Sequence, residues 1–216
     1  MPLTDECMGT EADGSRSRDY CAYCYKDGKF TQDFTMSQMI EFCLQFLDQI
    51  NAQAGWNLTP VQAKEQMWKR FPQLKRWKEK DTRTLAEKAA ALLAQCENVT
   101  VASVDADGYP RPVQMSKIEA TGFSEVWMAT SAGSVKVSDF KQNNKAGLCY
   151  EHYGDGVAMR GMVDVVTDDA VRKAMWQDWF VHHFPGGYDD PEYVLLHFVG
   201  KEATFWINGE FSHAEV

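Results

Sequence analysis

The segment Tyr109–Tyr150 decides the fold, and it contains two motifs, RPVQMSK at 111–117 and WMATSAGSVK at 127–136. From Tyr109 to Lys145 basic residues outnumber acidic ones by five to three, in a chain whose formal net charge is -9. The basic residues are Arg111, Lys117, Lys136, Lys141 and Lys145, and the acidic ones are Glu119, Glu125 and Asp139. A small cationic region that is rich in hydroxyl groups and lies between apolar strands suits a phosphate group.

The hydrophobic period around this segment predicts a small antiparallel barrel. From Asn98 onward apolar and polar residues alternate, and turn-forming residues separate the runs, as at 105–108 and 121–122. The expected strands are 99–104, 110–118, 124–130, 146–151, 157–166 and 192–207, with a short helix at 134–143. Short antiparallel strands joined by tight turns are typical of a barrel.

Along the sequence, helices are predicted before the strands and between the last two of them. Apolar residues at spacings of three and four predict a helix that begins at Thr35 and extends to Ile50. Two further helix starts have the capping-box spacing, Thr59 with Gln62 and Thr84 with Glu87. Asp168 opens a last helix, whose expected buried face consists of Val171, Met175, Trp176, Trp179 and Phe180.

Composition and charge limit the function. The 216 residues are 44% hydrophobic, which is enough for one domain with a core and a smaller appendage. The net charge of -9 disfavours non-specific binding to nucleic acid, because such binding neutralises many phosphates with Lys and Arg. No apolar run approaches the roughly 20 residues that span a bilayer, and the N-terminus lacks the pattern of a signal peptide. We therefore expect a cytoplasmic protein with neither nucleic acid nor a membrane as a partner.

The six cysteines divide into two groups. Cys43, Cys96 and Cys149 occupy helical or strand positions where we expect buried thiols. Cys21 and Cys24 form a CxxC motif in a polar loop that contains glycines, and two such thiolates can bind one zinc ion. A closed structural zinc site needs four ligands, and Cys7 is a candidate for the third.

The segment YCAYCYKDGKF at 20–30, together with Met1-Pro2-Leu3 and ADGS at 12–15, resembles the zinc-ribbon module at the start of certain bacterial proteins. In that family another CxxC stands just before the segment that matches Met1-Pro2-Leu3. The resemblance therefore implies a truncated zinc-ribbon-like module at 1–34, in which zinc is possible but the ligand set is incomplete. We expect a helical segment at 35–80 to follow it, and the main domain to occupy 82–216.

The order of elements from Thr84 to Asn208 resembles the flavin-binding split barrels related to pyridoxamine 5'-phosphate oxidase. The resemblance is greatest to the general-stress-protein type, through RPV at 111–113, WMATS at 127–131, SVK at 134–136 and FPGGYDDP at 184–191. It implies an α+β chain with an antiparallel split β-barrel flanked by helices. It also implies bound FMN and a homodimer with the flavin at the subunit interface.

The FMN phosphate can be assigned to particular residues. Its negative charges and acceptor oxygens call for a cationic fork, a point charge and hydroxyl groups. Together with the strand residues Pro112, Val113 and Ser116, the expected cofactor-binding set is Arg111, Thr130, Ser131, Ser134 and Lys136. Ser134 and Lys136 lie in the first turn of the predicted short helix, where free backbone N–H groups favour an anion. The alternative is that Arg111 and Lys136 are solvated surface charges.

Two positions depart from the oxidase pattern. The oxidases hold the phosphate with an Arg, a basic residue five positions later, and Ser-Arg-Lys near the helix start. Ser116 and Val135 stand at the second and fourth of these positions, and Lys117 is expected to point to the opposite face of its strand. Weaker phosphate affinity, or compensation by a residue from the dimer partner, would follow.

The chemistry at the flavin is less constrained by the sequence. The oxidases proper use an Arg and a His near the C-terminus to bind the phosphate of the substrate, and no Arg follows Arg172. An authentic pyridoxamine-phosphate oxidase is therefore not expected. The leading hypothesis is an FMN-dependent oxidoreductase of a small molecule with unknown catalytic residues, where His182 and His183 are candidates for lining a substrate pocket. The alternatives are a non-catalytic flavin carrier or redox sensor, or a haem carrier.

Overall fold

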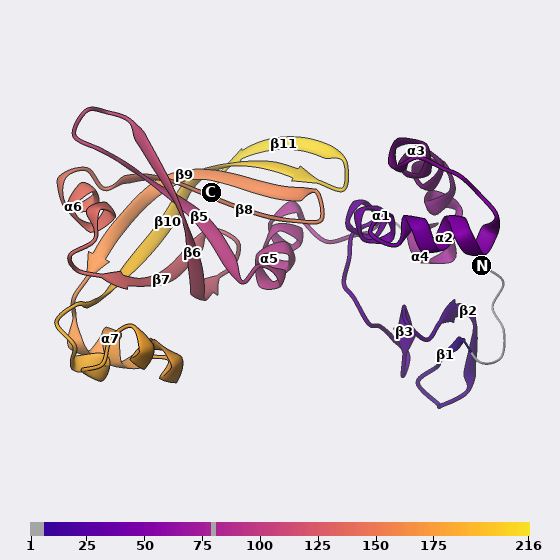
Figure 1. Cartoon of the computed structure of the whole chain (residues 1–216), viewed down its shortest axis with the longest axis horizontal. Coiled ribbons are helices and arrows are strands. Elements are labelled where there is room, and N and C mark those ends of the chain that lie inside the picture. Colours follow the sequence, from indigo (N-terminus) through magenta and orange to yellow (C-terminus); the bar gives the residue numbers. More distant parts are fainter. Residues whose placement is uncertain (1–6, 79–80) are drawn as a thin grey trace. The chain divides into compact units, whose positions relative to one another are not determined.

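The computed structural model describes residues 7–78 and 81–216 and divides into two compact units, Met1–Thr82 and Arg83–Val216 (Figure 1). Met1-Pro2-Leu3, on which the zinc-ribbon resemblance partly rests, lies outside the described residues. The elements of the first unit are β1 (Met8–Thr10), β2 (Arg16–Cys21), β3 (Tyr25–Lys26), β4 (Lys29–Phe30), α1 (Met36–Leu44), α2 (Leu47–Ala54), α3 (Pro60–Arg70) and α4 (Lys75–Lys78).

The first unit combines two small antiparallel ladders with short helices. β1 pairs with β2, and β3 pairs with β4. Thr35 and Thr59 both cap their helices with complete capping boxes, which confirms these two helix starts. The expected single helix from Thr35 to Ile50 is wrong: the chain leaves the helical conformation at Phe46, with φ -106° and ψ 16°, and continues as α2. No glycine or proline marks this break in the sequence.

The second unit begins with α5 (Leu85–Gln95) and is otherwise dominated by strands. The strands are β5 (Asn98–Val104), β6 (Pro110–Thr121), β7 (Glu125–Ser131), β8 (Lys145–His152), β9 (Asp155–Val166), β10 (Tyr193–Ile207) and β11 (Glu210–Glu215). The remaining elements are α6 (Val135–Gln142), α7 (Asp169–Ala174) and the 3-10 helices Asp178–His182 and Gly187–Asp189. Thr84 caps α5 with the expected capping box.

The strands form a closed antiparallel barrel, as the sequence predicts. Their order is β11-β10-β7-β6-β5-β8-β9, and β9 also pairs with β10, which closes a barrel of six strands and leaves β11 as an appended edge. Residues that alternate along each strand point inward, including the fully buried Val101, Met128 and Leu196. The helices α5 and α6 contribute Leu93 and Phe140 to the same core, and Figure 1 shows them at opposite ends of the barrel.

A second, smaller core covers the outside of the barrel. Phe180, Phe184, Tyr193 and Leu195 are its buried members, and α7 and the 3-10 helix Asp178–His182 supply much of its cover. Asp168 caps α7 as expected, but the helix ends at Ala174, so the expected helical run to Phe180 is wrong. The change of conformation leaves Trp179 half exposed instead of buried.

Candidate functional site

The first turn of α6 presents groups that suit an anion. Ser134 is the N-cap residue, but its hydroxyl does not bond to the helix and lies 3.4 Å from the hydroxyl of Thr130. The ammonium of Lys136 makes no ion pair within the described part of the chain, and burial lowers its pKa. Free backbone N–H groups at the start of a helix carry a partial positive charge. The end of β7 and the first turn of α6 therefore contribute two hydroxyls, a desolvated cation and free backbone N–H groups.

Arg111 lies on β6 and contacts α6 through the side chain of Asp139. Its Nη2 lies 3.3 Å from Oδ2 of Asp105, and its Nε lies 3.5 Å from Oδ2 of Asp139, one turn beyond Lys136 on α6. Asp139 is buried and also accepts a 2.7 Å hydrogen bond from the hydroxyl of Ser103. The guanidinium is thus partly neutralised by two carboxylates, while half of the side chain remains exposed. Arg111 joins the start of β6 to α6, whereas Lys136 makes no such ion pair within the described residues.

A cleft of about 410 Å³ runs beside these residues, between β6, β7 and the 3-10 helix Asp178–His182. Three of the predicted cofactor residues line it, namely Ser116, Thr130 and Ser131. Trp179, Phe180 and Phe184 form an aromatic wall, which the helical pattern of the sequence did not assign to the site. Arg111, Pro112, Val113, Ser134 and Lys136 do not line the cleft. An aromatic wall facing hydroxyl groups is chemically suited to a ring system with polar edges.

Glu192 holds the loop that leads into α6, and sequence reasoning did not identify it. Its Oε2 accepts a hydrogen bond from the Ser131 hydroxyl and another, at 3.1 Å, from the backbone N–H of Gly133. These two bonds lower the pKa of the Glu192 carboxyl. The Ser131 hydroxyl is therefore already engaged, and its contribution to the cleft is chiefly one of position.

The other predicted residues on β6 lie on its two faces, one exposed and one turned toward the barrel core. Pro112 pairs with Ala102 and is exposed, while Val113 pairs with Val101 and packs against the barrel core. Ser116 is exposed and its hydroxyl donates a 3.1 Å hydrogen bond to Oδ1 of Asn98.

Lys117 points away from Ser116, as expected from the strand period. Its ammonium donates a 2.5 Å hydrogen bond to the carbonyl oxygen of Leu93 on α5. Burial lowers the pKa of Lys117. This lysine therefore satisfies the end of α5 and does not replace the basic residue that is missing at Ser116.

One of the two adjacent histidines belongs to the cleft. His183 lines it, with its ring centroid 6.0 Å from that of Trp179, whereas His182 is not among the lining residues. His183 is the titratable side chain of the cleft that could hold or move a proton near a bound ring. Their position beside the Phe-Pro-Gly-Gly loop identified the pair, but the structure is needed to show that only His183 of the two lines the cleft.

The CxxC thiols meet, but they do not fit a closed zinc site. The Sγ atoms of Cys21 and Cys24 lie 3.4 Å apart. Cys7 is near them through its backbone, since its carbonyl oxygen accepts a 2.8 Å hydrogen bond from the N–H of Ala22. Within residues 7–78 and 81–216 no group of three or more His, Cys, Asp or Glu side chains could hold a metal ion. The expected set of Cys7, Cys21 and Cys24 is therefore not assembled as a metal site.

In the metal-free protein we expect Cys24 to be a slow nucleophile. Burial and the neighbouring Cys21 thiol raise the pKa of Cys24 to about 11. A smaller thiolate fraction, partly offset by higher intrinsic nucleophilicity, should make its alkylation at neutral pH about tenfold slower than that of exposed Cys149. A time course with iodoacetamide after chelator treatment, followed by peptide mass spectrometry, measures both rates. The rate at Cys24 should still be rising at about pH 10; equal rates at the two thiols would contradict the raised pKa.

The other cysteines differ in burial. Cys96 is buried as expected and Cys43 is half-buried, but Cys149 is exposed, so the expectation of a buried thiol is wrong there. Its neighbours Leu148 and Tyr150 occupy the inward face of β8, which places Cys149 on the outward face.

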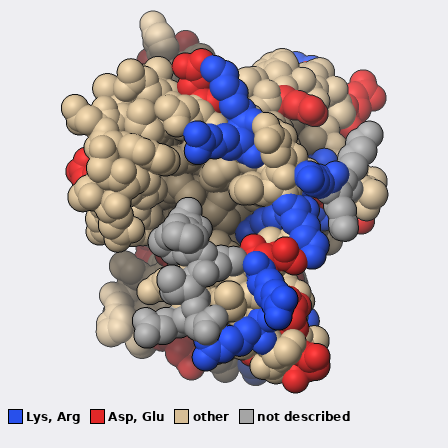
Figure 2. All heavy atoms as spheres, turned by 90° about the vertical axis from the view of Figure 1, so that its right-hand side faces the viewer, with Lys and Arg blue, Asp and Glu red and all other residues tan. Residues whose placement is uncertain are grey.

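A band of Lys and Arg side chains is visible on one face of the molecule, with Asp and Glu beside it (Figure 2). Three lysines of the first unit form ion pairs: Lys64 pairs with Glu41, Lys69 with Glu65, and Lys75 with Asp19. Arg76 donates to the carbonyl oxygens of Gln32 and Phe34 and stacks over Phe30 and Trp77. These four cations are therefore engaged in contacts within the unit. No helix in the part of the chain that the structure describes is long and apolar enough to cross a membrane.

The fold and the site together define a class, the antiparallel split barrels with a ligand cleft beside the helix that follows the third strand. A family model described as "Pyridoxamine 5'-phosphate oxidase like" matches residues 84–214, and the chain belongs to this family. A second model, described as "Putative zinc ribbon domain", matches residues 1–78. Both resemblances expected from the sequence are thereby confirmed. No curated protein matches the chain.

Solved structures show the same barrel. A protein related to general stress protein 26 of B. subtilis, from Clostridium acetobutylicum, is 24% identical with a TM-score of 0.52, over 57% of this chain and 89% of its own. General stress protein 26 from Bacillus anthracis is 20% identical with a TM-score of 0.51, over 60% and 98%. A pyridoxamine 5'-phosphate oxidase-related, FMN binding protein from Nostoc punctiforme is 15% identical with a TM-score of 0.45, over 56% and 86%. At these identities the likeness concerns the fold.

Proposed function

We propose that the second unit binds FMN and acts as a flavin-dependent oxidoreductase of a small molecule. The observation that carries the proposal is the start of α6, where the hydroxyls of Thr130 and Ser134 lie 3.4 Å apart and Lys136, in the first turn, has no carboxylate partner among the described residues. A phosphate supplies the negative charge and the acceptor oxygens that these groups lack. Membership of the pyridoxamine 5'-phosphate oxidase-like family supports the same assignment.

The cleft next to this phosphate site would hold the flavin ring. Trp179 and Phe180 offer apolar faces, and Ser116 offers a hydroxyl at the opposite side. When bound, the flavin supplies two-electron redox chemistry, while the protein positions it and excludes water. His183 at the cleft wall is the residue that would hold or move a proton. No Lys or Arg lines the cleft, which disfavours a phosphorylated substrate such as pyridoxamine phosphate.

Titration of the purified apoprotein with FMN and with riboflavin tests the binding step. We expect FMN to bind and to be retained on a desalting column, and riboflavin to bind much more weakly because it lacks the phosphate. Equal affinities would show that no phosphate site exists. Oxidation of NADH or NADPH by the loaded protein then separates an enzyme from a flavin carrier, since a carrier binds FMN without turnover.

The proposal includes a homodimer in the cytoplasm. The family resemblance implies a flavin between two subunits, and Ser116 and Trp179, which line the cleft, are exposed to a second copy. Light scattering on the FMN-loaded protein should give twice the chain mass of 24.5 kDa. A monomer that binds FMN with full affinity would contradict the dimeric arrangement but leave the phosphate site intact.

A further inference from the structure

The turn between β2 and β3 brings two thiols together at the surface of the first unit. The Sγ atoms of Cys21 and Cys24 lie 3.4 Å apart, and the residues between them, Ala22 and Tyr23, are exposed. The backbone N–H of Cys24 donates a 3.0 Å hydrogen bond to the carbonyl oxygen of Cys21, which is the bond that closes a β-turn. The two thiols therefore share one tight turn with solvent on its outer side.

Backbone hydrogen bonds hold both ends of this turn. At the first end, where β1 pairs with β2, the N–H of Ala22 donates a 2.8 Å hydrogen bond to the carbonyl oxygen of Cys7. At the other end, the N–H of Thr31, just after β4, donates a 3.1 Å hydrogen bond to the carbonyl oxygen of Cys24. The backbone that carries the two thiols is thus fixed from two neighbouring segments.

Gly9 lets β1 pass close to the same turn. A Cβ atom added at Gly9 would collide with the carbonyl oxygen of Tyr25 and lie 3.2 Å from that of Cys21. Both are backbone atoms, so a side chain at this position would require the residues that flank the turn to shift. A glycine here therefore allows the strand to support the turn at close range.

The geometry of the turn suits a disulfide. The Cα atoms at the two ends of a β-turn lie within about 7 Å of each other, and those of a disulfide are usually about 4.4–6.8 Å apart. In the reduced chain the two sulfur atoms are already in contact. The S–S bond can therefore close chiefly by rotation of the two side chains, with the strands left in place.

A zinc ion is the alternative occupant of this turn, because the family model that matches residues 1–78 is that of a zinc ribbon. Zinc in a structural site takes four ligands, and the turn supplies two. Across residues 7–78 and 81–216 no third His, Cys, Asp or Glu side chain completes a group that could hold a metal ion. The described residues therefore suit chemistry between the two thiols themselves.

We propose that Cys21 and Cys24 form a two-electron thiol–disulfide redox site, whose oxidant is a low-molecular-weight disulfide, RSSR. One thiolate attacks RSSR, forms a mixed disulfide and releases RS⁻. The second thiolate, held in contact with the first sulfur, attacks that sulfur, forms the Cys21–Cys24 bond and releases the second RS⁻. The two thiol protons pass to the leaving groups, so the dithiol is oxidised and RSSR is reduced to two RSH. The inference does not depend on FMN, because every residue that carries it belongs to the first unit.

Equilibration of the full chain with reduced and oxidised glutathione tests the proposal. Trypsin releases both thiols on one peptide, residues 19–26, which contains no other cysteine. After an acid quench and alkylation in denaturant, we expect this peptide to be two hydrogens lighter than the dithiol and to carry neither an alkyl group nor glutathione. A peptide that carries only glutathione, or a cross-link from Cys24 to Cys7 or Cys43, would overturn the proposal.

The same equilibrium in concentrated urea separates the effect of the fold from that of the CxxC spacing. Because the native turn already holds the thiols together, we expect the equilibrium constant for oxidation to be at least about tenfold larger in the folded chain than in urea. Equal constants, or a smaller constant in the folded chain, would show that the turn does not favour the disulfide and would overturn the proposal.

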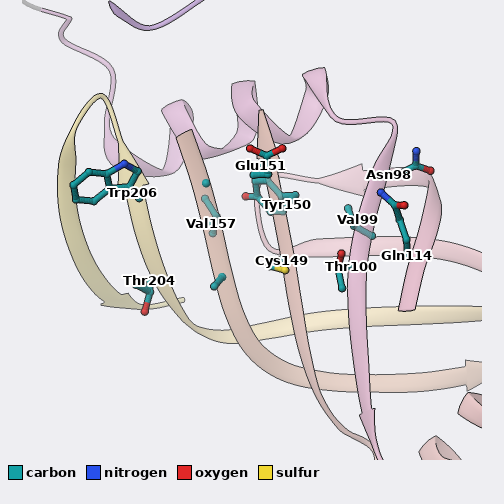
Figure 3. Close-up of a pocket in the computed structure, with 12 residues that line it drawn as sticks. Asn98, Val99, Thr100, Gln114, Cys149, Tyr150, Glu151, Val157, Thr204 and Trp206 are labelled. Atoms are coloured by element: carbon teal, nitrogen blue, oxygen red, sulfur yellow. The ribbon is translucent and has the colours of Figure 1, made fainter. Parts of the chain in front are cut away.

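Two other cysteines provide the controls. Cys149 is exposed on β8 and is the one cysteine among the described residues that line the barrel surface in Figure 3, so it can gain at most one glutathione and no internal disulfide. Cys43→Ser removes a half-buried thiol of α1 and should leave the oxidation of peptide 19–26 unchanged. Loss of the internal disulfide in Cys43→Ser would make Cys43 a required partner and overturn the proposal.

Metal analysis of the full chain, purified without a chelator, tests the zinc alternative. We expect no stoichiometric zinc, and we expect peptide 19–26 to be oxidised to the same extent with and without a chelator. Retention of about one zinc ion per chain, with both thiols protected from oxidised glutathione until a chelator is added, would show that the thiols are metal ligands and overturn the proposal.

Discussion

Replacing Lys136 by Met should weaken FMN binding by about 10- to 150-fold and leave riboflavin binding unchanged. The expected range corresponds to one charge-assisted hydrogen bond of about 1.5–3 kcal/mol. Methionine retains an apolar stem of similar length, so the half-buried contacts of Lys136 at the start of α6 are largely kept. The loss is specific to FMN because riboflavin carries no phosphate for the ammonium to bind.

Lys141→Met is the matched control for this prediction. Lys141 lies in the last turn of the same helix, is exposed, and faces the end of α6 where the helix dipole is negative. Fluorescence titration of each apoprotein with FMN and riboflavin gives the four dissociation constants. If Lys136→Met and Lys141→Met have the same FMN affinity as the wild type, the phosphate does not bind at the start of α6.

The pattern of residues predicted the barrel because nearly every strand has a buried face. Alternation of apolar residues from Asn98 onward placed six strands within a few residues of their observed bounds, and three helix starts followed from Thr35, Thr59 and Thr84. The edge strand β11 was not predicted, although Asn208 and Gly209, both at positive φ, form the Asn-Gly turn that is typical of a hairpin. β11 has no buried residue, so it lacks the apolar alternation that marks the other strands.

The errors concern two places where the chain leaves the α-helical conformation although the apolar period continues. The break at Phe46 divides one row of apolar residues between α1 and α2. Leu47 is buried in the structure, as the expected single helix also required. The end of α7 at Ala174 removes Trp179 from the buried face and moves it to the wall of the cleft. Neither change has a glycine or proline signal in the sequence, so propensity alone could not predict it.

Three of the eight predicted cofactor residues line the cleft, and the long-range pairings around the site were not predicted. The grouping of Thr130, Ser134 and Lys136 follows from their closeness along the chain, and the structure shows Thr130 and Ser134 in contact. Two other pairings join distant segments: Arg111 meets Asp139, and Ser131 meets Glu192, 61 residues away. Such contacts are set by the strand register and leave no mark in the local pattern. The sequence analysis assigned Arg111 and Ser131 to the phosphate, but in the structure both side chains already contact carboxylates.

Arg172 has a different kind of environment from Lys136, and its replacement by Met should destabilise the second unit by about 3 kcal/mol. The side chain of Arg172 is 10% exposed, and its Nη1 lies 3.0 Å from Oδ1 of Asp169. Its Nη2 donates to the carbonyl oxygen of Asp190, and the guanidinium lies 5.5 Å from the ring centroid of Tyr193. Methionine leaves the Asp190 carbonyl without this donor and removes the cation from the aromatic face, and a buried acceptor that loses a charged donor costs up to about 3 kcal/mol.

Two variants separate the possible causes of this loss. Asp169→Ala breaks only the contact with a carboxylate that is 88% exposed, so it should cost less than about 1 kcal/mol. Arg172→Lys keeps the positive charge but lacks the planar fork that joins Asp169 to Asp190, so it should restore only part of the stability. Urea unfolding of the full chain, followed by tryptophan fluorescence, measures all three free energies of unfolding. If Arg172→Met and Asp169→Ala are equally stable, the arginine does not hold the segment around Asp190 onto α7, and the aromatic wall of the cleft depends on the packing of Phe180 and Phe184 alone.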